Sequence, residues 1–139
     1  MSDKTISQLF NEKAKEYASD LGVATSAVKF DEDNNWHAQE FEHGVILGYM
    51  KKRTMNKNLI CVYGKLFHEW WKNKDAVWLG KPLEDTFTKT NKEGYEILVQ
   101  RFEHGVINCR SDGGNDVQWL SWHDWHAISH PKDVSNKHP

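Results

Sequence analysis

The segment Phe41-Glu42-His43-Gly44-Val45-Ile46 returns letter for letter as Phe102-Glu103-His104-Gly105-Val106-Ile107. Six consecutive identities are very unlikely by chance in a chain of 139 residues. A repeat of this kind indicates a structure made of similar units. Leu21-Gly22 and Leu79-Gly80 keep nearly the same spacing as the two hexapeptides. The sequence therefore predicts two successive copies of one unit.

A third copy begins near the end of the chain, where Trp122-His123-Asp124-Trp125 is similar to Phe67-His68-Glu69-Trp70. We expect one domain, because 139 residues can bury a sizeable core without disulfides or metal. The expected bounds are 1–131 for this domain, about 6–62 for repeat one, about 63–118 for repeat two, about 119–130 for a third helix, and 132–139 for a flexible tail.

Each repeat is expected to start with a helix. Apolar residues recur at helical spacing from Ile6 to Leu21, after a capping segment at residues 2–5, and a second helix is expected at 63–74. Gly22 and Gly80 follow these segments at positions where the chain must turn left-handed.

Strands are expected after the helices. Polar loops at 31–35 and 88–94 lead into strand patterns at 36–41 and 95–102, and a return strand begins at each Val-Ile. A tight hairpin favours positive φ, which would explain the repeated His-Gly pair between the strands. The predicted fold class is α+β, with tandem helix and β-hairpin repeats that are propeller-blade-like or form a small pseudo-symmetric domain.

Charge and composition exclude several classes of protein. The 18 basic and 20 acidic residues balance, which argues against nucleic acid as a partner. The sequence has no stretch of membrane-spanning length and no apolar signal region at its start, so a cytoplasmic location is expected, or export to a cell wall if a leader was removed. Cys61 and Cys109 do not form a disulfide framework and are expected to be free thiols.

The repeats resemble the LGFP repeat family. The second copy carries the match in a helix ending in Trp, then Leu79-Gly80-Lys81-Pro82, then residues 100–107. The first copy carries it less fully, at residues 21–26 and 36–46. The resemblance covers about residues 6–126, and it rests on the order of these motifs, found twice.

This resemblance implies a non-catalytic module that holds proteins to cell-wall polysaccharide, with repeats arranged in a closed, propeller-like disc. Members of the family usually carry more repeats than this chain. Because two repeats cannot close a ring, one apolar face would stay open. Either the first and third helices cap each other, or subunits associate, so a homo-oligomer is a further expectation.

Aromatic and histidine side chains are the candidate ligand-binding residues, because flat apolar rings stack on sugars and exposed aromatic clusters mark binding surfaces. The candidates are Trp36, Trp78, Tyr95, Trp119, Trp122, His43 and His104. The alternative is that the tryptophans form the core of the repeats, as the matching positions of Trp70 and Trp125 suggest.

Metal binding and catalysis are weighed against structural roles. His123 and His126 are weak candidates for metal ligands, and His130 could lie on the same helix face. The alternative is that His123 is only the repeat equivalent of His68 and binds no metal. Glu42 and Glu103 form a symmetric pair, but nothing in the sequence sets the distance that general acid–base catalysis needs. No nucleophile, phosphate-loop or metalloprotease motif occurs, so neither enzymatic activity nor a cofactor is expected.

The sequence thus predicts a non-catalytic module that binds carbohydrate or cell-wall polysaccharide through an aromatic surface. The alternative is a protein–protein interaction module, such as an inhibitor, immunity or assembly factor, because aromatic hot spots serve protein partners as well.

Overall fold

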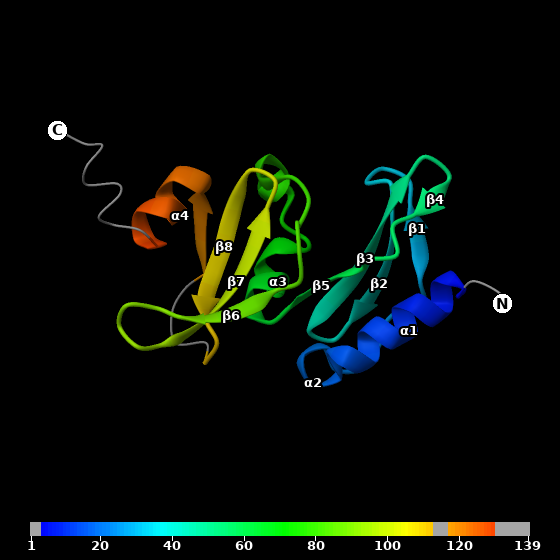
Figure 1. Cartoon of the computed structure of the whole chain (residues 1–139), viewed down its shortest axis with the longest axis horizontal. Coiled ribbons are helices and arrows are strands. Elements are labelled where there is room, and N and C mark those ends of the chain that lie inside the picture. Colours follow the sequence, from blue (N-terminus) through cyan, green and yellow to red (C-terminus); the bar gives the residue numbers. More distant parts are fainter. Residues whose placement is uncertain (1–3, 113–116, 130–139) are drawn as a thin grey trace. The chain divides into compact units, whose positions relative to one another are not determined.

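The computed structural model describes residues 4–112 and 117–129, and the expected tail at 132–139 lies outside them. The chain divides into two compact units, Met1–Trp71 and Lys72–Pro139, called unit 1 and unit 2 below (Figure 1). Both units combine helical segments with antiparallel strands, so the expected α+β class is confirmed. Within the described ranges, no helix is long and apolar enough to cross a membrane.

Unit 1 is a sheet with helices at both ends of its sequence. Its elements are α1 (Ile6–Glu16), α2 (Ala18–Leu21), β1 (Lys29–Asp31), β2 (Trp36–Phe41), β3 (Gly44–Lys51), β4 (Thr54–Met55), β5 (Ile60–Tyr63) and α3 (Lys65–Trp70). The strands run in the order β1-β2-β3-β4, and β5 also pairs with β3. The helices α1, α2 and α3 all contact β3.

Unit 2 has a four-stranded sheet in the order β6-β7-β8-β9. Its elements are the 3₁₀ helix η1 (Lys74–Leu79), β6 (Phe87–Thr90), β7 (Glu96–Phe102), β8 (Gly105–Arg110), β9 (Gln118–Ser121) and α4 (Trp122–Ser129). Helix α4 lies beside β8 and β9 (Figure 1). The sheets match in register, because Gly44 pairs with Phe41 and Tyr63 as Gly105 pairs with Phe102 and Ser121.

The repeated hexapeptide lies at the centre of both sheets. Val45 and Ile46 in β3, and Val106 and Ile107 in β8, are fully buried. Adjacent strand residues point to opposite faces of a sheet, so burial of both members of each pair means that both faces are covered there. These strands provide the most deeply buried apolar surface of their units, where burial contributes most to stability.

Several element boundaries differ from the sequence predictions. The first helix is interrupted at Tyr17, and the second begins only at Lys65, because Ile60–Tyr63 is paired with β3. The third helix was expected from Trp119 but begins at Trp122, since Gln118–Ser121 pairs with β8 as β9. The first helix does begin at a capping box, in which Thr5 and Gln8 each accept from the backbone N–H of the other.

The glycines of the two motifs have different structural roles. Gly22 and Gly80 have positive φ values, 75° and 78°, which glycine adopts without strain. At Gly22 ψ is −156°, so this residue does not have the left-handed helical conformation expected there. The prediction of positive φ at the hairpin tips is wrong, because none of His43, Gly44 and Gly105 has it. Glycine is needed at the hairpin tips because a larger residue would not fit. A Cβ at Gly44 would lie 2.4 Å from Leu21 Cδ2, and one at Gly105 would lie 2.5 Å from the Leu120 carbonyl oxygen.

Candidate functional site

The hairpin tip of each unit is bound to the turn that follows Leu-Gly. In unit 1, Glu42 Oε1 accepts from the Val23 backbone N–H at 3.0 Å, and the Glu42 N–H donates to the Val23 carbonyl at 2.9 Å. In unit 2, Glu103 makes the same pair of bonds with Lys81, at 2.7 and 3.0 Å. We call this arrangement the tip–turn contact.

A third bond completes each tip–turn contact. The backbone N–H of His43 donates to the Leu21 carbonyl, and that of His104 donates to the Leu79 carbonyl, both at 2.9 Å. Glycine is required in the turn because a Cβ at Gly80 would lie 2.7 Å from Glu103 Oε1. The Leu-Gly and Phe-Glu-His-Gly segments are therefore two parts of one structural motif. In both units the glutamate carboxylate accepts a hydrogen bond from the backbone of the turn.

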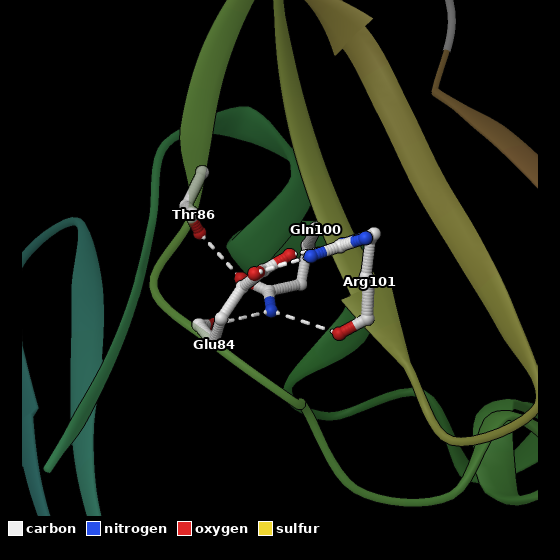
Figure 2. Close-up of polar contacts among 4 residues, drawn as sticks. All are labelled: Glu84, Thr86, Gln100 and Arg101. Atoms are coloured by element: carbon white, nitrogen blue, oxygen red, sulfur yellow. Dashed lines mark hydrogen bonds and ion pairs between the residues drawn. The ribbon is translucent and has the colours of Figure 1, made fainter. Parts of the chain in front are cut away.

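A glutamine in one strand of each hairpin, buried in unit 2 and half-buried in unit 1, binds the loop that follows the turn. Gln100 is fully buried; its Nε2 donates to the Glu84 carbonyl at 2.7 Å, and its Oε1 accepts from Thr86 Oγ1 at 2.7 Å (Figure 2). Beside it, the Arg101 guanidinium binds the Glu84 carboxylate through two nitrogens, which raises the pKa of Arg101. In unit 1, Gln39 Nε2 donates to the Ser26 carbonyl at 3.2 Å.

Trp36 is a core residue of unit 1. It is 5% exposed and stacks on Tyr49 and on Trp71, with ring centroids 5.7 and 6.3 Å away. Trp71 also stacks on Phe67, and its indole nitrogen donates to Glu40 Oε1 at 3.1 Å. The structure therefore places Trp36 inside an aromatic cluster, where it is buried and stacks on two other rings.

Trp119 and Trp122 are half-buried in unit 2. Trp119 lies in β9 opposite Ile107. Trp122 packs with Phe87 and Trp125 against the buried cluster of Ile97, Val99 and Val106. Its indole nitrogen also donates to the Glu103 carbonyl at 3.0 Å, next to the tip–turn contact. Trp122 thus contributes to the packing of unit 2.

Trp78 and Tyr95 are the exposed members of the predicted aromatic set, at 47% and 43%. Trp78 lies at the hairpin tip, since its Cζ3 is 3.0 Å from where a Cβ on Gly105 would be. Tyr95 precedes the other end of β7, and the Arg110 guanidinium covers its ring at 3.9 Å from the centroid. The two exposed rings therefore lie at opposite ends of the β7–β8 hairpin and do not form one platform.

The predicted histidines whose side chains the structure describes all lie on the surface. His43 and His104 are exposed at the two hairpin tips, and His123 is exposed in α4. The side chain of His126 and all of His130 lie outside the described part of the chain. Within that part, no group of three or more His, Cys, Asp or Glu side chains is placed to hold a metal ion.

Sequence reasoning missed His68 as a functional candidate. His68 is exposed on α3, and its Nε2 lies 3.4 Å from Nδ1 of His43. The two residues are 25 positions apart, and their proximity depends on the fold. Exposed apolar residues close to Trp78 in the sequence were also missed: Val77 is 82% exposed and Leu83 is 50% exposed. Their signal was present in the sequence, as apolar residues on either side of Leu79-Gly80.

Comparisons of this chain with protein-family models and with curated proteins gave no match.

Proposed function

We propose that this chain is a non-catalytic binding module built from two copies of one unit, and that it recognises carbohydrate through Trp78. Support for two copies comes from the shared tip–turn contact and the matching strand register of the two units. The resemblance of both motifs to the LGFP repeat supports cell-wall polysaccharide as the ligand class and a propeller-blade-like role for each unit.

The single observation that carries the proposal is the position of the Trp78 ring. It is 47% exposed, yet its Cζ3 lies 3.0 Å from the position that a Cβ on Gly105 would take at the hairpin tip. A flat ring that is held in place and open to solvent can stack on the apolar face of a pyranose, because little side-chain entropy is then lost on binding. Trp36, which is buried and stacks on two other rings, is assigned to the core.

A glycan binding screen tests this function. The full chain is titrated with glycans and wall polysaccharides, followed by tryptophan fluorescence and confirmed by calorimetry. We expect saturable binding that Trp78→Ala abolishes and that Val77→Ala, at the neighbouring exposed position, leaves unchanged. Equal binding by the wild type and Trp78→Ala would contradict the role of this ring.

A protein partner is the second candidate function, because Trp78 has exposed aliphatic side chains close to it in the sequence. Val77 and Leu83 would add little to sugar stacking, whereas exposed apolar clusters are typical of protein interfaces. For such a partner, Val77→Ala and Leu83→Ala should weaken binding together with Trp78→Ala. The effect of Val77→Ala therefore separates the two functions once any ligand has been found.

A further inference from the structure

Two imidazole rings from different elements meet at the surface of unit 1. His43 lies in the turn between β2 and β3, and His68 lies on α3. Nδ1 of His43 is 3.4 Å from Nε2 of His68, and the rings are inclined at 78°. Both side chains are exposed, so a solute can reach the two nitrogens from solvent.

The separation of the nitrogens suits a shared metal ion. At 3.4 Å the two nitrogens are within hydrogen-bond reach, and which of them donates depends on the tautomers of the two rings. Two nitrogens bound to a tetrahedral Zn²⁺ at about 2.0–2.1 Å lie roughly 3.3–3.4 Å apart. The observed separation is therefore also that of two ligands of one metal ion, which would bind in place of the proton shared by the rings.

The backbone holds both histidines in place. The His43 N–H donates to the Leu21 carbonyl, and the His43 carbonyl accepts from the Gly64 N–H, both at 2.9 Å. Gly64 directly precedes α3, so the second bond joins the hairpin tip to the helix that carries His68. The His68 ring also packs edge-on against buried Phe67, 5.1 Å away. Ligands positioned in advance lose little entropy when a metal binds.

We propose that His43 and His68 form a binding site for a divalent transition-metal cation of the Zn²⁺, Ni²⁺ or Cu²⁺ class. Imidazole nitrogen is a preferred ligand for these ions. The protein supplies two ligands, and water occupies the remaining coordination positions. The site is independent of carbohydrate or protein binding at Trp78, because it lies in unit 1 and uses other side chains.

Calorimetric titration of the untagged full chain with Zn²⁺ at neutral pH tests this site. We expect saturable binding, and His43→Ala or His68→Ala should weaken it by at least about tenfold, since even residues that only support a metal ligand are worth 10–100-fold in affinity. His104→Ala is the matched control, because it removes the histidine at the same hairpin position of unit 2. It should leave the His43–His68 site intact.

A second measurement needs no substitution. Paramagnetic Ni²⁺ should broaden the ring proton signals of His43 and His68 in the nuclear magnetic resonance spectrum of the wild-type chain. Broadening of both rings at low Ni²⁺ supports the site. Unchanged Zn²⁺ affinity in both unit 1 variants, no saturable binding, or broadening only at other histidines would overturn it.

Discussion

A Cβ atom on Gly80 would lie 2.9 Å from the Cβ of Glu103, closer than two such atoms can approach. The Glu103 carboxylate reaches over this glycine to accept from the Lys81 N–H, so the turn and the hairpin tip require each other. Gly22 has the same relation to Glu42, with a Cβ separation of 3.2 Å.

Gly80→Ala is therefore expected to destabilise unit 2 by roughly 2–5 kcal/mol, from the cost of a left-handed alanine and from overpacking. Gly94→Ala is the matched control, because Gly94 also has positive φ but a Cβ added there would meet no atom within 4 Å. It should cost only about 1–2 kcal/mol. Urea unfolding followed by circular dichroism measures both, and equal losses would show that the close approach to Glu103 is unimportant.

Thr86→Val should destabilise unit 2 by about 1–3 kcal/mol, because the buried Oε1 of Gln100 loses the hydroxyl that donates to it. Valine keeps the shape of threonine, so the loss reports on the hydrogen bond. Thr86→Ser keeps the hydroxyl and should cost less. The same unfolding measurement compares the two variants, and a larger loss in the serine variant would contradict this account.

The tryptophans should divide into two groups by their effect on stability. Trp36→Ala removes a buried ring that stacks on Tyr49 and on Trp71, and it should cost about 3–5 kcal/mol. Trp78→Ala removes a half-exposed ring and should cost about 1 kcal/mol or less. Thermal unfolding of both variants tests this. A large loss from Trp78→Ala would assign that ring to the core and remove the basis of the proposed binding surface.

Asp31 should make unfolding sensitive to acid. Its pKa lies below the ordinary 3.8, chiefly because the Asn34 side chain donates to the carboxylate at 2.8 Å, with added backbone bonds. A lowered folded-state pKa means that this stabilisation is present above pH 3.8 and is lost as the pH falls through the lower value. Asn34→Ala should raise the pKa of Asp31, as measured by carboxyl carbon chemical shift, and an unchanged value would refute the assigned cause.

The central hairpins could be predicted from the sequence, whereas the outer strands could not. Residues 36–41 lead from a polar loop into the repeated hexapeptide, which indicates β2, but β1 is only Lys29–Asp31, and Thr88–Thr90 of β6 is exposed and polar. Short edge strands of this kind carry little hydrophobic periodicity. In β9, the apolar run at Trp119 and Leu120 fits helix and strand equally, and only pairing with β8 decides between them.

The candidate site was predicted only in part for a similar reason. Residue type identified Trp78 and Tyr95, but burial of Trp36 depends on Tyr49 and Trp71, and sequence spacing does not reveal such neighbours. The proximity of His43 to His68 likewise depends on tertiary structure. Leu-Gly and Phe-Glu-His-Gly were recognised as recurrent, but their mutual contact, which explains why they recur together, appeared only in the fold.

The tip–turn contact also determines where a unit can change its length. From Gly22 to Glu42 the chain advances 20 positions, and from Gly80 to Glu103 it advances 23, yet the same bonds form. Strand register places the three additional residues between β6 and β7, since Asp31 pairs with Trp36 whereas Lys89 pairs with Ile97. The β6–β7 connection is therefore the natural position for grafting a foreign peptide, because the contact that closes the unit tolerates a longer chain there.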